Sequence, residues 1–262
     1  MWGVRCLLAA IRCEKGDVRG NLASHLRLLA EAASAGCQLA VFPEMSLTGS
    51  ADPAASPERL ISLDHPAVAR LAGASGDAGV GVCFGIAERA PDGRPYITQV
   101  LAAAGRVVGA QRKRYLGEGE EAYAPAAESV VFEHAGTRFG VVICAEAGFD
   151  APFDAAAAAG ARLVLFPAAP GLHGRRSDEA SWRRGFSWWQ GWGLGHACRQ
   201  AQRLGLWIAL AGQAGSTADE DFPGLAALVR PDSSVAARLP DWHPGVLIAD
   251  VPLRPGYIDQ PA

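Results

Sequence analysis

The sequence lacks the features that would place it in several common classes of protein. Its 262 residues carry 24 Lys and Arg against 27 Asp and Glu, so they give no basic excess of the kind that nucleic-acid-binding surfaces need. No apolar run reaches the roughly 18 residues that span a bilayer. Residues 1–13 have no basic start, apolar block and cleavage site typical of a secretory signal. We therefore expect no nucleic-acid partner, no membrane partner and a cytoplasmic location.

Several common site motifs are missing as well. The six cysteines are widely spaced without a C-x-x-C pair, which in a chain of this length favours reduced thiols. The six histidines never stand at metal-ligand spacing from one another or from a cysteine, so no zinc site is expected. There is no G-x-x-x-x-G-K-[ST] phosphate loop and no G-x-S-x-G serine elbow. The glycines at 191–195 lie in a Trp-rich helical stretch and not after a strand, which argues against a dinucleotide site.

What the chain does contain is a core-forming composition, with 50% hydrophobic and 19% charged residues. Leu22, Leu26, Leu29 and Ala33 recur on one face of an expected helix that ends near Gly36. Further helices are expected around 68–71, 155–159 and 181–204, and 212–224 has the composition of a surface loop. Short apolar runs predict strands at 4–11, 39–42, 80–87, 97–103, 107–111, 130–132, 139–143, 163–166, 206–211, 225–229 and 246–251. This alternation predicts a mixed sheet covered by helices, with no second domain.

One apolar run, at 39–42, continues into Pro43 and Glu44. Sites in α/β proteins are built where strands end, and burial there raises the pKa of a carboxyl group towards the range of a general base. The alternative is that Glu44 is a helix N-terminal acid or a solvated loop residue.

Three consecutive basic residues, Arg112, Lys113 and Arg114, end another expected strand and precede an acidic stretch. Strand alternation puts Lys113 on the side opposite its two neighbours. A buried lysine beside a carboxylate could stabilise a developing oxyanion. The alternative is a solvated charge cluster that pairs with the acids after it.

A third apolar strand, at 139–143, runs directly into Cys144, then small residues, with a helix expected from about Ala151. A cysteine on such a turn can present its sulfur to a substrate and use nearby backbone N–H groups as oxyanion donors. The alternative is a buried core cysteine, the role expected for Cys6, Cys83 and Cys198.

In chain order, these segments resemble the nitrilase superfamily of carbon–nitrogen hydrolases. That family shows an apolar strand ending F-P-E, a K-x-x-L segment followed by an acidic stretch and an aromatic-x-Pro, and an apolar strand ending I-C. The matching residues are Phe42-Pro43-Glu44, then Lys113-Arg114-Tyr115-Leu116 with Tyr123-Ala124-Pro125, and finally Ile143-Cys144. Gly160-Ala161 also resembles a G-A-x-hydrophobic run of the family, and the resemblance extends over nearly the whole chain.

The resemblance implies an α/β fold, a four-layer α-β-β-α sandwich, in a single carbon–nitrogen hydrolase domain spanning 1–262. It implies hydrolysis of a non-peptide C–N bond in a small linear amide, with no metal and no organic cofactor. Cys144 would attack the carbonyl carbon, and Glu44 would transfer the proton. Lys113, with the backbone N–H of Ala145, would stabilise the oxyanion.

Many relatives carry a further glutamate shortly after the lysine, which positions the substrate and the catalytic groups. Glu118, Glu120 and Glu121 compete for this role, and we favour Glu120. Ala145 stands where the C-W-E sequence of nitrile-hydrolysing members has Trp, which favours an amidase. Nitrile hydrolysis, acyl transfer to an acceptor other than water, and a catalytically silent metabolite-binding relative are the alternatives.

Two segments have roles that the sequence leaves open. The sequence does not decide whether Glu146 faces the pocket or solvent. The segment 182–192 holds four tryptophans, which either line the substrate pocket or pack in the core or a subunit interface. Because relatives commonly dimerise through helices in this part of the fold, a homodimer or larger assembly is expected.

Overall fold

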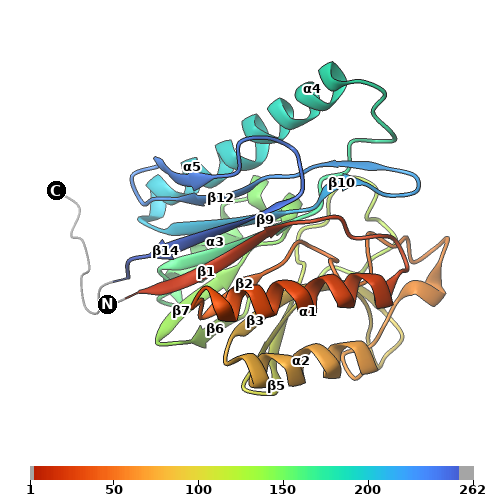
Figure 1. Ribbon diagram of the computed structural model, residues 1–262, viewed down its shortest axis with the longest axis horizontal. Helices are drawn as coiled ribbons and strands as arrows, with labels where there is room; N and C mark the ends of the chain where they lie inside the picture. The colour runs from red at the N-terminus through yellow and green to blue at the C-terminus, as the bar shows by residue number, and fades with distance from the viewer. Residues whose placement is uncertain (1–2, 254–262) are drawn as a thin grey trace.

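The computed structural model describes residues 3–253 and consists of two six-stranded sheets packed face to face, with helices on both outer sides (Figure 1). This is the four-layer α-β-β-α sandwich that the resemblance implied. The alternation of elements predicted one mixed sheet, and this prediction is wrong because the structure has two. After β5 the chain leaves the first sheet, and β6 begins the second. Only the return of β14 to β1 carries the C-terminal part back to the first sheet.

The first sheet has three parallel strands at its centre and antiparallel strands on both sides. β1 pairs in parallel with β2, and β2 with β3, while β14, β4 and β5 run antiparallel to their neighbours. In sheet order the strands are β14 (Gly245–Val251), β1 (Val4–Ala10), β2 (Leu39–Val41), β3 (Gly81–Arg89), β4 (Pro95–Ala103) and β5 (Arg106–Arg112).

The second sheet also has three central parallel strands, β7, β8 and β9. Antiparallel strands extend it at both edges. In sheet order the strands are β13 (Val235–Arg238), β12 (Ala226–Val229), β9 (Trp207–Gly212), β8 (Leu163–Ala168), β7 (Thr137–Val141) and β6 (Val131–His134). Each strand expected from an apolar run is present, with ends shifted by a few residues.

The helices form the two outer layers (Figure 1). α1 (Val18–Ser34) and α2 (Pro66–Ala78) pack against the first sheet. α3 (Ala151–Ala158) and α5 (Gly195–Leu204) pack against the second. The long helix expected at 181–204 is present as α4 (Glu179–Trp189), a π-helical turn η3 (Gln190–Leu194) and α5. Two short 3-10 turns complete the elements, η1 (Pro57–Arg59) and η2 (Cys144–Gly148).

Helix α1 begins at a capping aspartate, since Asp17 accepts the Gly20 N–H, and Gly36 follows its end with φ +69°. Its buried face differs from the predicted one, because it is shifted towards two polar residues. The buried residues are Asn21, His25, Leu28, Leu29 and Ala32. Hydrophobic periodicity did not predict that Asn21 and His25 are buried. Buried polar side chains need hydrogen-bond partners, and here other segments of the chain supply them, which periodicity cannot detect.

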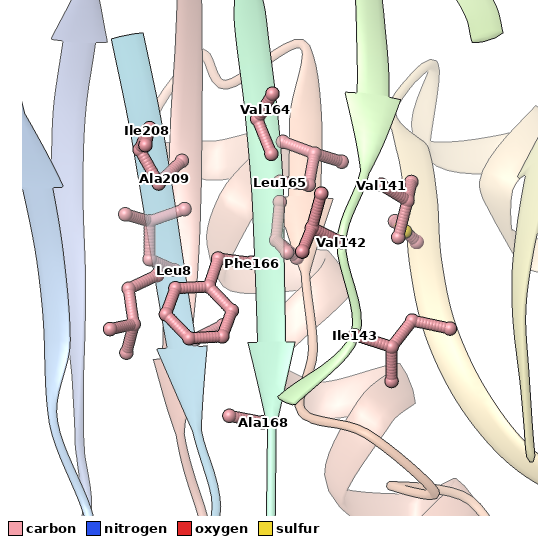
Figure 2. Close-up of a cluster of buried hydrophobic side chains, with 14 of the residues drawn as sticks. Leu8, Val141, Val142, Ile143, Val164, Leu165, Phe166, Ala168, Ile208 and Ala209 are labelled. Carbon is pink, nitrogen blue, oxygen red and sulfur yellow. The ribbon is translucent and has the colours of Figure 1, made fainter. Parts of the chain in front are cut away.

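The core is divided between the two faces of the first sheet. In β1, Leu7 and Ala9 belong to the cluster beneath α1 and α2, while Leu8 and Ala10 belong to the cluster between the sheets. Figure 2 shows Leu8 of the first sheet beside Phe166 of the second. Because both faces of the central strands are covered, their sequences are continuously apolar, not alternating.

The segment 212–224, expected as a surface loop, is a largely buried hairpin. Its strands are β10 (Ala214–Ser216) and β11 (Asp221–Pro223), paired antiparallel. The Ala214 N–H donates to Ile11 O, directly after β1 of the first sheet, and the Gln213 N–H donates to Ala168 O in β8 of the second. The prediction failed because polar and small residues here make hydrogen bonds inside the protein instead of to water.

Candidate active site

Glu44, Lys113 and Cys144 lie together where strands of both sheets end. The Lys113 ammonium donates to Glu44 Oε1 at 2.7 Å, and the Cys144 thiol is hydrogen-bonded to the Glu44 carboxylate. All three residues are buried. Glu44 follows β2, Lys113 follows β5 and Cys144 follows β7. The four-layer fold therefore brings the three strand-end candidates from the sequence together, with Glu44 in contact with both Lys113 and Cys144.

The Glu44 carboxylate is held at both oxygens. Oε1 accepts the Lys113 ammonium, and Oε2 accepts the Ala169 N–H at 3.0 Å. The following residue, Met45, adopts φ +47°, and its backbone N would lie only 2.1 Å from a Cβ atom placed on Gly85. The turn that presents Glu44 thus needs a glycine in β3.

Lys113 continues the register of β5, because its N–H donates to Ile97 O in β4 at 2.8 Å. The neighbouring Arg112 makes two hydrogen bonds to the buried Glu88 carboxylate, at 2.8 and 2.6 Å. Lys113 itself is fully buried and donates to Glu44. Arg114 donates to Ser129 Oγ at 2.8 Å. The basic run is therefore a set of three separately partnered cations and not a solvated cluster.

A second carboxylate also binds the lysine. Glu120 Oε1 accepts the Lys113 ammonium at 2.6 Å, and Glu120 Oε2 accepts the Gly117 N–H at 2.6 Å. Glu118 and Glu121 are exposed. Of the three glutamates that competed in the sequence, Glu120 is the one in contact with Lys113.

Cys144 occupies the strained start of the 3-10 turn η2, with φ +45°. This conformation turns the chain sharply at the end of the apolar segment whose Val142 and Ile143 are drawn in Figure 2. The Ala169 N–H that bonds Glu44 also makes a hydrogen bond to Cys144. Ala145 follows in the turn and is half-buried, and helix α3 begins at Ala151 as expected.

Glu146 faces neither the pocket nor solvent. Its carboxylate is buried and accepts the N–H groups of Ile143 at 2.8 Å and Arg114 at 2.7 Å, with a longer bond of 3.4 Å from Tyr115. Burial raises its pKa. The side chain therefore joins the segment before Cys144 to the segment after Lys113, and this fixes the lysine relative to the sulfur.

The electrostatics follow from one buried cation between two carboxylates. Burial raises the pKa of Glu44, and the Lys113 charge opposes that rise. Burial alone would lower the pKa of Lys113, but the charge of Glu44, together with the charge and hydrogen bond of Glu120, reverses the direction and raises it. Burial and the Glu44 charge raise the pKa of the Cys144 thiol well above its usual range. Lys113 is thus held charged and Cys144 is a protonated thiol at rest.

The tryptophans of 182–192 have different roles. Trp189 is buried and packs near Phe166 of β8, with ring centroids 6.1 Å apart. Trp192 lies beside Gly148 at the end of the cysteine turn, because a Cβ atom there would meet its ring at 3.5 Å. Trp188 is 49% exposed. Core packing therefore accounts for Trp189, while Trp192 borders the segment that carries Cys144.

The contact that sequence reasoning missed is the Ala169 N–H. A backbone donor leaves no signature in residue type, and the apolar run of β8 signalled only that a strand ends there.

Within residues 3–253, no group of three or more His, Cys, Asp and Glu side chains is arranged to hold a metal ion. All six cysteines are free thiols, as their spacing predicted. No helix among the described residues is both long and apolar enough to cross a membrane.

Known proteins resemble this chain in sequence and in fold. In solved structures, an amidase from Nesterenkonia sp. superposes with a TM-score of 0.80 at 26% identity, covering 96% of this chain and 91% of that one. A cysteine-to-alanine variant of the Nesterenkonia AN1 amidase, described as a member of the nitrilase superfamily, gives the same TM-score at 25% identity, again over 96% and 91% of the two chains.

A curated protein of Pseudomonas protegens, described as "Hydrolase in pqqF 5'region", is 32% identical over 158 residues. That match spans 58% of this chain and about half of the relative's length, 55%. The family model of carbon-nitrogen hydrolases matches residues 7–255, nearly the whole chain. With a family match of that extent and amidases of the nitrilase superfamily among its structural neighbours, the chain belongs to the carbon–nitrogen hydrolases.

Proposed function

We propose that this protein hydrolyses the C–N bond of a small linear amide through a thioester on Cys144. The observation that carries the proposal is the buried arrangement of a thiol, a carboxylate and an ammonium group, with Glu44 in contact with both Cys144 and Lys113. Burying three ionisable groups together costs stability unless their interactions repay it, and such clusters of perturbed groups mark functional sites.

The first step would form the acyl-enzyme. Glu44 takes the thiol proton as the Cys144 sulfur attacks the amide carbon, so a thiolate is formed only as the new C–S bond forms. Burial and the Glu44 charge raise the pKa of the thiol, which favours this concerted transfer. The Lys113 ammonium and the Ala145 N–H stabilise the oxyanion. Glu44 then passes the proton to the leaving nitrogen, the C–N bond breaks, and ammonia or an amine departs.

The second step would restore the enzyme. Glu44 removes a proton from water, whose oxygen attacks the thioester carbon, and the C–S bond breaks as Glu44 returns that proton to the Cys144 sulfur. The products are a carboxylic acid and the free thiol, so the overall reaction consumes one water for each C–N bond broken. Glu120 takes no proton in this scheme and holds Lys113 in place through a second ion pair.

The amide class is supported by the residue after the nucleophile and by the structural neighbours. Ala145 stands where nitrile-hydrolysing relatives have Trp. Alanine-for-cysteine variants of the Nesterenkonia amidase include a complex with butyramide, and another variant carries the acetamide moiety of fluoroacetamide on its active-site cysteine. These are short amides, which supports the same class here.

The test is release of ammonia from aliphatic, aromatic, carbamoyl and ω-amides, with several nitriles, by the wild-type protein and by Cys144→Ala. We expect release from short amides that disappears in the variant, and a covalent acyl adduct on Cys144 in rapidly quenched samples analysed by mass spectrometry. Cys198→Ala is the matched control, because Cys198 is a half-buried thiol on α5 without a carboxylate or lysine partner. Equal activity in wild type and Cys144→Ala would refute the mechanism.

We also propose that the protein acts as a homodimer or larger homo-oligomer. Phe149 and Trp188 are large apolar side chains that are 44% and 49% exposed in the single chain, and contact with a second copy would remove them from water. Sedimentation velocity on the wild type and on Trp188→Ser tests this, and a monomer at micromolar concentration would contradict it.

A further inference from the structure

A second group of polar residues is buried behind the turn that carries Glu44. His25 of α1 is fully buried, and its ring stacks on Phe42 with centroids 4.1 Å apart. Its Nδ1 lies 2.7 Å from Asn21 O and its Nε2 lies 2.9 Å from Ser46 Oγ. Phe42 and Ser46 stand two residues before and two residues after Glu44. The imidazole thus contacts the catalytic turn on both sides without reaching the reacting groups.

The partners of the ring fix the direction of each hydrogen bond. A carbonyl oxygen only accepts, so His25 Nδ1 carries the proton and donates to Asn21 O. Burial lowers the pKa of His25 to about 4, so the ring is neutral near pH 7 and Nε2 is unprotonated. Nε2 therefore accepts the Ser46 hydroxyl proton. Ser46 Oγ in turn accepts the Gly85 N–H of β3 at 3.1 Å.

This chain of bonds replaces regular strand pairing after β2 ends. The Leu47 N–H donates to Gly85 O at 2.8 Å, and Thr48 Oγ1 accepts the Ala87 N–H at 2.9 Å. The turn is thus joined to β3 through two hydroxyl groups and one backbone bond. Asn21 adds a bond from its Nδ2 to Leu47 O at 3.1 Å. Of the two hydroxyl groups that join the turn to β3, the Ser46 hydroxyl is the one hydrogen-bonded to an imidazole.

We propose that His25 is a positioning residue for the amidase reaction: by accepting the Ser46 hydroxyl it orients the turn so that Glu44 meets Lys113, Ala169 and Cys144 together. This inference rests on the proposed function, because Glu44 must be the base for its position to matter. A Ser–His nucleophile pair is excluded by burial, since both residues are shielded from any substrate.

The experiment compares two replacements of His25 whose amide groups stand at different distances from the backbone, so that only the longer one extends to Ser46. In His25→Gln the amide oxygen can occupy the place of Nε2 and accept the Ser46 proton. In His25→Asn the shorter side chain can keep the bond to Asn21 O but does not extend to Ser46. We expect kcat of His25→Asn to fall by roughly 10- to 100-fold with KM little changed, since an error of about 1 Å in a catalytic group costs that much. His25→Gln should recover most of kcat.

Two further variants separate positioning from packing. Leu29→Ala removes a buried side chain from the same helix, and its activity is expected to be unchanged below its melting temperature. Ser46→Ala removes the bond to His25 and also the acceptor of the Gly85 N–H, so it should lower kcat at least as much as His25→Asn does. The double variant should lower kcat no further than Ser46→Ala alone, because the bond between His25 and Ser46 is already lost. If His25→Asn does not fold, Ser46→Ala against Leu29→Ala provides the same comparison.

A second readout does not depend on the amide. Alkylation of Cys144 by iodoacetamide needs Glu44 in place, so its rate should fall in His25→Asn and recover in His25→Gln. If the wild type hydrolyses no amide, the proposed function fails while this rate still tests the positioning. Equal kcat and equal alkylation in His25→Asn and wild type would overturn the inference, and so would equal losses in His25→Asn, His25→Gln and Leu29→Ala.

Discussion

The two sheets of this protein follow the same strand order and supply different chemistry. Each has an antiparallel edge strand, then three parallel strands, then two antiparallel strands: β14-β1-β2-β3-β4-β5 in the first and β6-β7-β8-β9-β12-β13 in the second. The first sheet supplies Glu44 and Lys113. The second supplies Cys144 and the Ala169 N–H. Neither sheet holds all four groups, so the candidate site forms only where the two sheets meet.

Two cysteines make this comparison concrete. Cys13 follows β1, which ends at Ala10, just as Cys144 follows β7, which ends at Val141. Cys13 is fully buried, and its thiol donates to Ile11 O. Burial alone raises the pKa of Cys13, whereas Cys144 also interacts with Glu44 and Lys113. The same place in the fold thus gives an inert thiol or a candidate nucleophile according to the neighbouring charges.

The largest expected difference is in thiol reactivity. We expect iodoacetamide to modify Cys144 at least 100-fold faster than Cys13, because Glu44 can take the Cys144 proton while Cys13 has no base beside it; a positioned base contributes about 10²–10⁴-fold. Peptide mapping by mass spectrometry over time measures both rates. Cys198 is more exposed than either and controls for access alone. Faster modification of Cys198 than of Cys144 would contradict the prediction.

The next effect concerns the lysine. Lys113→Met keeps the apolar stem and removes the charge, and we expect kcat to fall by about 100-fold or more because an oxyanion donor is lost. Arg114→Ala is the neighbouring control, since its guanidinium contacts Ser129 and not the site carboxylates. Steady-state kinetics with the best amide measures both. A loss below about tenfold in Lys113→Met would contradict the role of Lys113 in stabilising the oxyanion.

A smaller effect is expected for Glu146, which joins the segments from the two sheets. Glu146→Ala leaves the Ile143 and Arg114 N–H groups without their acceptor, at a cost of about 1–3 kcal/mol for each buried donor. Urea unfolding should therefore show a lower free energy of unfolding, and kcat should fall roughly tenfold because Lys113 is no longer fixed relative to Cys144. The exposed Glu118→Ala is the control and should change neither quantity.

The smallest effect is a shift in pH dependence. Burial raises the pKa of Glu44, so kcat/KM should fall on acidification at a pH above the ordinary Glu value of 4.5, as the base becomes protonated. Glu120 contributes to this rise by repulsion. Glu120→Gln should therefore move the acid limb to lower pH. The pH profiles of kcat/KM for both proteins measure the shift, and movement to higher pH would contradict the assignment of that limb to Glu44.

Much of the local structure was predictable because a buried segment consists mainly of apolar residues, which are visible in the sequence. Central parallel strands are covered on both faces, so they are continuous apolar runs and were found with small errors at their ends. The gap between the expected strands at 97–103 and 107–111 holds Gly105, which adopts φ +83° in the turn from β4 to β5. Glu44 and Cys144 were found because a polar residue at the end of such a run is unusual, and Lys113 was found because strand alternation sets it opposite its two basic neighbours.

The remaining features depend on contacts between distant segments, which the sequence does not encode locally. Lys113 meets Glu44 across 69 residues, and Ala169 meets Glu44 across 125. Hydrogen bonds made inside the protein turned the expected loop at 212–224 into a buried hairpin, and they placed His25 on the buried face of α1. The sequence by itself determined the strands and the chemical groups at their ends. Tertiary structure decided which groups meet, because a hydrogen bond requires two atoms within about 3 Å, and only the packing of one sheet on the other supplies that proximity.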